Sequence, residues 1–90
     1  METNFKVGDI VKSLSGHDQN RLFLVVGLDK NGYLAIIDGR YRGKEKQKLK
    51  NPKHVEFVAH DENLLNKVNS PIVTNAEIYK LIKAYKNVKE

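Results

Sequence analysis

The chain has no cysteine, few aromatic residues and no long hydrophobic run. Without cysteine, disulfide bridges and thiolate zinc sites are excluded, so the fold must be held together by packing alone. The longest apolar run, Leu22 to Val26, is far too short to cross a membrane. The N-terminus contains the acidic Glu2 and no apolar segment, unlike a signal peptide. We therefore expect a soluble cytoplasmic protein with no membrane partner.

Length and residue grouping also restrict the function. A chain of 90 residues can bury one modest core, which leaves no room for a two-domain enzyme with a cleft between its domains. The histidines His17, His54 and His60 show no metal-ligand spacing, and the six glycines match no nucleotide-binding loop. We expect a monomer that forms one domain, with no catalytic activity, no metal and no cofactor.

The excess positive charge of the chain is concentrated in one segment. The chain carries 16 basic and 11 acidic residues, for a net charge of +5. Residues 40–53, which we call the basic strip, hold seven basic residues against one acidic residue, a net of +6 that exceeds the total. Positive charge that is concentrated in one segment attracts polyanions more strongly than the same charge spread evenly over the surface. The strip therefore indicates a nucleic-acid partner.

Within the strip, six basic residues alternate with other residues from Arg40 to Lys50. If the segment is extended, all six lie on one side at a spacing of ~6.6 Å, close to the phosphate spacing of a nucleic-acid strand. Tyr41 and Leu49 would then face the sheet, although Tyr41 could instead stack on a base. A break at Gly43 would leave a mobile charged loop that binds nothing.

From Phe5 to Ala59 the sequence has the pattern of short strands separated by turn residues. The turns are Asp29–Gly32, where Asn31 and Gly32 would supply positive φ angles, and Asp38-Gly39. Short strands with tight turns and no intervening helix predict a mainly β fold, a small barrel of four or five strands over residues 1–60. The expected strands are Ile10–Leu14, Leu22–Val26, Tyr33–Ile37 and His54–Ala59.

Residues 61–90 have a different, helical pattern. Asp61–Asn69 has apolar residues at helical spacing and predicts a short turn over the end of the barrel. Thr74 to Glu77 is a capping box, and the residues behind it form an amphipathic stripe. We expect a helix over about Asn75–Asn87 that docks its apolar face on the barrel, because so short a helix is marginal alone. The stripe consists of Ile78, Leu81, Ile82 and Tyr85.

A second candidate binding region is the loop from Ser15 to Arg21, beside Lys12. Loops that join strands of a small barrel often bind ligands, because the barrel fixes their ends. This loop offers donors to phosphates and ribose hydroxyls, but an ordinary polar turn would have the same composition. The donors are Ser15, His17, Gln19, Asn20 and Arg21.

Two stretches resemble the KOW motif, which is found in SH3-like barrels of ribosomal proteins and transcription elongation factors. The first is Gly8-Asp9-Ile10-Val11, with Gly16 and the ending Val25-Val26-Gly27. The second, Tyr33 to Gly39 followed by the Lys-rich run, is similar to small KOW-domain RNA-binding proteins of Firmicutes. Those proteins are related to a large-subunit ribosomal protein family of archaea and eukaryotes. The resemblance covers about residues 5–58.

The resemblance implies RNA binding, with ribosomal RNA as the expected partner and a role on the ribosome or in translation. The first barrel loop and the basic strip would face the RNA. His17 and Gln19 depart from the family pattern and remove two phosphate contacts, while Asn20 replaces a turn glycine in a conformation that asparagine tolerates. The implied site residues are Lys12, Gly16, His17, Arg21, Arg40, Tyr41, Arg42, Lys44, Lys46, Lys48, Lys50 and Lys53.

Two other functions remain open from the sequence. SH3-like barrels also bind proteins, so the strip could contact an acidic surface of a ribosomal protein or a transcription factor. DNA binding is a more distant alternative, because the one amphipathic helix needs its apolar face for docking and offers no recognition helix.

Overall fold

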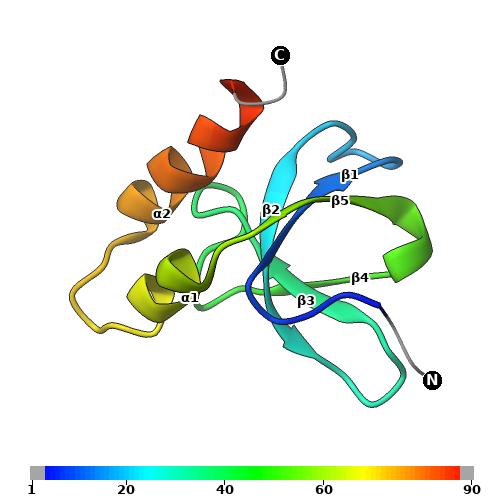
Figure 1. The fold of residues 1–90 in the computed structure, drawn as a ribbon, viewed down its shortest axis with the longest axis horizontal. Coiled ribbons are helices and arrows are strands. Elements are labelled where there is room, and N and C mark those ends of the chain that lie inside the picture. The colour runs from blue at the N-terminus through cyan, green and yellow to red at the C-terminus, as the bar shows by residue number, and fades with distance from the viewer. Residues whose placement is uncertain (1–3, 88–90) are drawn as a thin grey trace.

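A computed structural model describes residues 4–87 of the chain. Five strands form one antiparallel sheet in the order β4-β3-β2-β1-β5 (Figure 1). The first four strands form a meander, and β5 returns to pair with the free edge of β1. The strands are β1 (Asp9–Ser13), β2 (Leu22–Leu28), β3 (Leu34–Ile37), β4 (Lys48–Lys50) and β5 (Val55–His60). The helices are α1 (Glu62–Val68) and α2 (Asn75–Lys83), with 3-10 turns η1 (Pro52–His54) and η2 (Ala84–Asn87).

The sheet curls around a first core. The register shifts between Ile10 and Val11 and between Val25 and Gly27, and irregularities of this kind bend strands and increase their twist. The strands enclose a cluster of buried side chains to which neither helix contributes, so the prediction of a small mainly β barrel is confirmed. The cluster consists of Val11, Phe23, Val25, Leu34, Ile36 and Val55.

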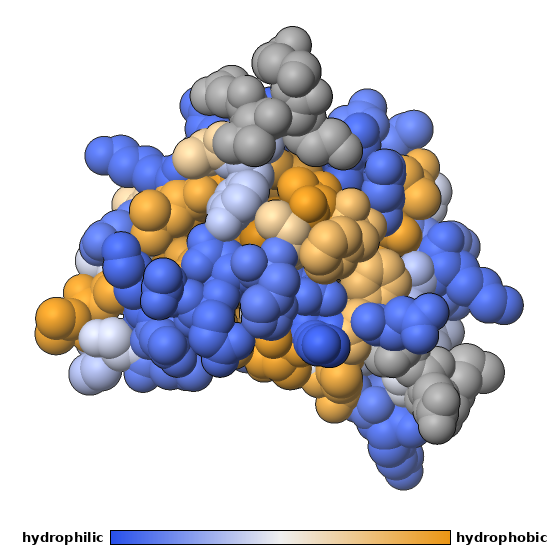
Figure 2. Space-filling view, in the orientation of Figure 1, coloured by the Kyte–Doolittle hydropathy of each residue, from blue (hydrophilic) through white to orange (hydrophobic). Residues whose placement is uncertain are grey.

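A second core lies between the sheet and the two helices, which pack on the same side of it (Figure 1). Buried residues of the strands, including Ile10 and Leu24, contact Leu64 of α1 and both Ile78 and Ile82 of α2. On the face shown in Figure 2, polar side chains gather near the middle, where α1 lies, and apolar side chains lie on both sides of them. The predicted docking of the amphipathic helix is therefore confirmed.

The second helix begins where the capping box predicts, whereas the segment Asp61–Asn69, expected to form a short turn, contains the helix α1 (Glu62–Val68). The side chain of Asp61 accepts a hydrogen bond from the amide of Leu64, and that of Thr74 accepts one from the amide of Glu77. The second helix is α-helical only to Lys83 and ends as the 3-10 turn η2. Neither helix within residues 4–87 has the length and apolar character needed to span a bilayer.

Two local predictions are wrong. The basic strip is not extended, because only Lys48–Lys50 is a strand and residues 40–47 form turns. Tyr41 lies among these turns and is 53% exposed, whereas Leu49 lies on β4 and is 56% exposed because its neighbours Lys48 and Lys50 turn toward Asp18. The β2–β3 hairpin is present, but of its two turn residues only Gly32 has a positive φ.

Candidate nucleic-acid interface

The loop between β3 and β4 is shaped by the buried carboxylate of Asp38. Its Oδ1 atom accepts hydrogen bonds from the backbone amides of Arg40, Tyr41 and Arg42, at 2.9, 2.9 and 2.8 Å. The amides of Asp38 and Gly39 both donate to the carbonyl of Arg42. An aspartate that collects amides in this way fixes a tight turn. Because the amides point inward, the side chains of Arg40, Tyr41 and Arg42 are exposed.

Three separate segments bring cations onto two tyrosine rings. The guanidinium carbon of Arg21, from the β1–β2 loop, lies 4.1 Å from the ring centre of Tyr41. Arg40 lies over both rings, 5.0 Å from the centre of Tyr41 and 5.5 Å from that of Tyr79 on α2. Lys83 lies 5.8 Å from the centre of Tyr79. We call these five residues the cation–aromatic ladder.

A hydrogen bond reinforces the middle of the ladder. Arg40 donates from Nη1 to the hydroxyl oxygen of Tyr79 at 3.3 Å. This bond raises the pKa of Arg40 further above its usual value and lowers the pKa of Tyr79. Arg40 therefore keeps its charge at every physiological pH, and the ladder presents fixed positive charge beside exposed aromatic surface.

Two neighbouring hollows in the surface share the lining residues Arg21 and Tyr41. The first has a volume of about 230 Å³ and is lined by both ladder tyrosines, with Leu22 and Ile82 beside them. The second has a volume of about 240 Å³ and lies on the side of the β1–β2 loop. Each hollow is lined by four basic side chains and by one aspartate, Asp38 in the first and Asp18 in the second, whose carboxylates already accept hydrogen bonds from the protein. This excess of positive charge makes the face a candidate site for an anion that carries an aromatic group. The basic side chains of the first are Arg21, Arg40, Lys83 and Lys86, and those of the second are His17, Arg21, Arg42 and Lys48.

Part of the basic strip serves the fold instead. Asp18, which is 5% exposed, receives hydrogen bonds from Lys48 at 2.7 Å and from Lys50 at 3.1 Å. The hydroxyl of Ser13 donates to the same carboxylate at 2.7 Å. Burial alone would raise the pKa of Asp18, but the hydrogen bonds from Lys48, Ser13 and Lys50 hold it well below its usual range. We call this group the Asp18 clamp, and it ties the β1–β2 loop to β4.

Lys44 is also held internally. Its ammonium group donates to the carbonyl oxygens of Ser70 and Val73, at 3.2 and 3.0 Å. These bonds fasten the β3–β4 loop to the segment that joins the two helices. The ammonium groups of Lys44, Lys48 and Lys50 are therefore already paired, and we leave these residues out of the central interface.

The remaining sequence-predicted residues lie in four different settings. Arg21, Arg40 and Tyr41 meet in the ladder, and His17 and Arg42 line the second hollow. Three predicted residues lie away from the ladder, and their charged groups have no partner among residues 4–87: Lys12 on β1, Lys46 in the β3–β4 loop and Lys53 on η1. Gly16 lies in the β1–β2 loop with a φ of +89°.

Sequence reasoning missed the contribution of α2. Tyr79 and Lys83 lie off the apolar stripe of the helix, one turn apart, and an aromatic residue outside such a stripe is a signal that could have identified them. It also missed Asp38 as the organiser of the loop, although the Asp38-Gly39 pair already predicted a turn at that place.

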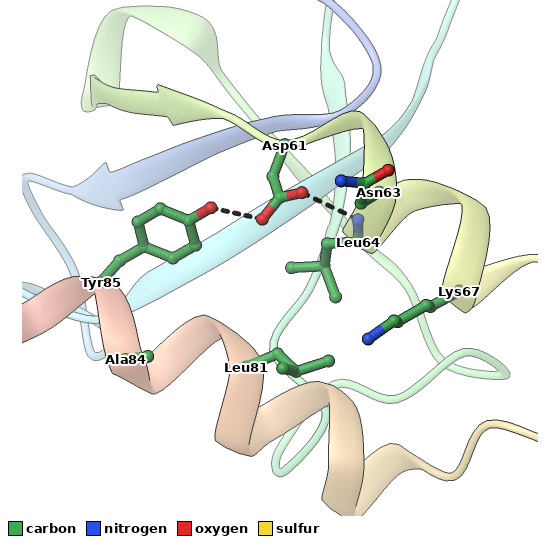
Figure 3. A pocket seen from close by; sticks show the side chains of 7 residues that line it. All are labelled: Asp61, Asn63, Leu64, Lys67, Leu81, Ala84 and Tyr85. Atoms are coloured by element: carbon green, nitrogen blue, oxygen red, sulfur yellow. Dashed lines mark hydrogen bonds between the residues drawn. The ribbon is translucent and has the colours of Figure 1, made fainter.

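A third hollow, of about 320 Å³, lies between α1 and α2 (Figure 3). The hydroxyl of Tyr85 donates to Asp61, the residue that caps α1. Burial, together with this bond, raises the pKa of Tyr85 to about 12. Burial alone would raise the pKa of Asp61, but hydrogen bonds from Tyr85 and from the amide of Leu64 lower it. The hydrogen bond between Tyr85 and Asp61 thus ties the end of the second helical segment to α1 and helps to fix the position of α2, which carries Tyr79 and Lys83.

Replacing Tyr85 with phenylalanine is expected to destabilise the fold by about 1–2 kcal/mol, because a partly buried hydrogen bond to a carboxylate is lost. For a domain of this size the thermal midpoint should fall by about 5–10 °C. Tyr33→Phe is the matched control, since the Tyr33 hydroxyl has no partner in the described part of the chain and 40% of the residue is exposed. Equal midpoints for the two variants would show that the Asp61 bond contributes nothing.

The fold and the site define a small mainly β barrel protein with a basic, aromatic face. A scan against protein-family models finds no match, and a search of curated proteins finds no significant relative.

Proposed function

We propose that this protein is a non-catalytic RNA-binding protein that associates with ribosomal RNA or the translation machinery. The observation that carries the proposal is the cation–aromatic ladder, in which three segments distant in sequence converge on one exposed face. The KOW resemblance supports the translational setting, and the ladder supports RNA as the ligand.

The chemistry of the face matches that of a nucleic-acid strand. Arginine guanidinium groups bind phosphate in a bidentate manner, and they also stack on aromatic planes. Tyrosine rings and guanidinium planes are the groups on which RNA-binding proteins stack bases. Phosphate contacts from Arg21, Arg40, Arg42 and Lys83 would position the RNA, and they carry little sequence information of their own. Recognition would then follow the shape of the RNA.

An anisotropy titration with a structured ribosomal RNA fragment, repeated over a range of salt concentrations, tests the proposal. If these four cations contact phosphates, the slope of log K against log salt should be roughly −2.8 to −3.6. The double variant Arg40→Glu/Arg42→Glu should bind at least about tenfold more weakly and reduce the slope by about 1.5–2. Its thermal midpoint should be nearly unchanged, because both side chains are exposed.

The matched control is Lys6→Glu/Lys30→Glu, which changes the net charge equally. Both lysines are exposed and lie at the opposite end of the strands from the β1–β2 loop. Equal loss of affinity in the two double variants would mean that only net charge matters, and a flat salt dependence would remove the proposed phosphate contacts. Capture of one acidic protein from nuclease-treated lysate, with no RNA binding, would favour the protein-interaction alternative.

A further inference from the structure

We infer that the first hollow binds the base of an unpaired nucleotide, so that the RNA target contains a bulge, a loop or a single-stranded end at this site. The inference depends on the proposed RNA-binding function and specifies which form of RNA the ladder recognises. It rests on the size and lining of the hollow, the exposure of the Tyr41 ring and the arrangement of cations around both rings.

The hollow has the size and lining of a base site. Its volume of about 230 Å³ is below the range of drug-sized ligand pockets, which begins near ~300 Å³, and a nucleobase is smaller than such ligands. Leu22 and Ile82 provide apolar surface, and the rings of Tyr41 and Tyr79 lie among the lining residues. A flat aromatic group that enters here would contact rings and aliphatic side chains together.

The ring of Tyr41 is exposed, and that of Tyr79 is partly exposed. Tyr41 has 53% of its surface exposed, and its ring contacts are the guanidinium groups of Arg21 and Arg40. A base can stack on the same surface and keep the guanidinium groups as neighbours, because both base and guanidinium have planar faces that fit an aromatic ring. The arginines then remain beside the nucleotide and can bind its phosphate.

A continuous RNA duplex would contact the cations of this face but not its first hollow or its aromatic rings. Bases inside an A-form helix are stacked on one another, so a duplex offers a protein mainly phosphates and 2′-hydroxyl groups. Contacts of that kind require cations but no exposed rings. An unpaired nucleotide uses the whole face, with its base in the first hollow and a flanking phosphate in the second, near Arg42 and His17, because the two hollows share Arg21 and Tyr41.

Two RNA hairpins with the same stem test the inference. One carries 2-aminopurine as a single unpaired bulge, and the other carries it paired within the stem. We expect the full-length protein to bind the bulged hairpin at least about fivefold more tightly, the lower end of what stacking one base contributes. The fluorescence of the bulged 2-aminopurine should change on binding as the base moves onto a tyrosine ring, while that of the paired base stays constant.

Tyr41→Leu and Tyr79→Leu keep apolar bulk but remove the rings. Each should reduce the preference for the bulged hairpin over the paired hairpin to less than about twofold, measured as the ratio of the two affinities for the same variant. Tyr33→Leu is the control, because Tyr33 is also exposed, at 40%, but lies in the β2–β3 hairpin away from the ladder. Thermal midpoints measured beside the parent confirm that the variants are folded.

The outcomes separate the inference from the proposed function. Equal binding of both hairpins with unchanged fluorescence overturns the base site and leaves RNA binding intact. A bulge preference that survives in both tyrosine variants also overturns it, since the rings would then not be the stacking surface. Failure to bind either hairpin overturns the site and the proposed function together.

Discussion

Replacement of Asp18 with alanine is expected to destabilise the fold by about 3–5 kcal/mol, because it leaves a buried ammonium group without its counter-charge. Lys50 is only 8% exposed, and its ammonium group bonds to Asp18 and to the carbonyl of Ser15. Removing the carboxylate also takes away one of the two acceptors of the Ser13 hydroxyl, which keeps the carbonyl oxygen of Ser15 at 3.0 Å. Since small domains are stable by only about 5–15 kcal/mol, much of the protein's stability depends on this one side chain.

Urea unfolding of three variants measures this effect. Lys48→Met removes the more exposed partner, whose side chain is 33% exposed, and should change the free energy of unfolding by about 1 kcal/mol or less. The double variant Asp18→Leu/Lys50→Met removes both buried charges and should recover most of the stability that Asp18→Ala loses. If the double variant is as unstable as the single one, the loss reflects packing and not an unpaired charge.

The same clamp sets a pH dependence. The pKa of Asp18 is held well below its usual value in the folded protein, whereas an unfolded aspartate titrates near ~3.9. The unfolded state therefore binds this proton first as the pH falls, and the stabilisation is present above about pH 4 and is lost below it. The urea midpoints of the parent and of Asp18→Asn should accordingly approach each other as the pH is lowered from 7 to 2.

The elements of the fold were predictable because their signals are local. The apolar run at Leu22 to Val26 became the buried central strand β2, and the stripe at Ile78 and Ile82 became the docked face of α2. Thr74 capped the helix as its spacing from Glu77 predicts. Each of these patterns lies within one element, so the periodicity of that element reveals it.

The arrangement of the basic strip was not predictable, because its determinants are distant in sequence. The alternation from Arg40 to Lys50 suggested one row of charges, but Asp38 turns the chain by collecting three amides. Lys48 then pairs with Asp18, 30 residues earlier, and Lys44 reaches Ser70, 26 residues later. A count of charges shows that a segment is basic, but not which of its ammonium groups the fold itself has already paired.

Gly39 is the position where the ladder is most sensitive to a change in the backbone. Its φ is +82°, and a Cβ atom placed there would lie 2.4 Å from the carbonyl oxygen of Asn75 and 2.6 Å from the amide nitrogen of Tyr79. Both are backbone atoms of α2, so no side-chain rotation can relieve the contact. Gly39→Ala should therefore destabilise the fold by about 2–4 kcal/mol, through strain at the positive φ and overpacking against the helix.

Gly16→Ala separates the two causes. Gly16 has a similar φ of +89°, but the nearest atoms to its added Cβ would be 3.6 and 3.8 Å away. Gly16→Ala should therefore lower the free energy of unfolding only by the part that comes from the positive φ, about 1 kcal/mol. An equal loss of stability in Gly16→Ala and Gly39→Ala would mean that the β3–β4 loop and α2 do not approach closely at Gly39.

The second readout of Gly39→Ala is RNA affinity. The loop that contains Gly39 carries Arg40 and Tyr41, whereas α2 carries Tyr79, so moving the helix away from the loop separates the two halves of the ladder. We expect affinity for the bulged hairpin to fall by at least about tenfold under conditions where the variant is still folded. Full affinity in a destabilised but folded variant would mean that α2 does not belong to the interface, and that the β1–β2 and β3–β4 loops bind the RNA without it.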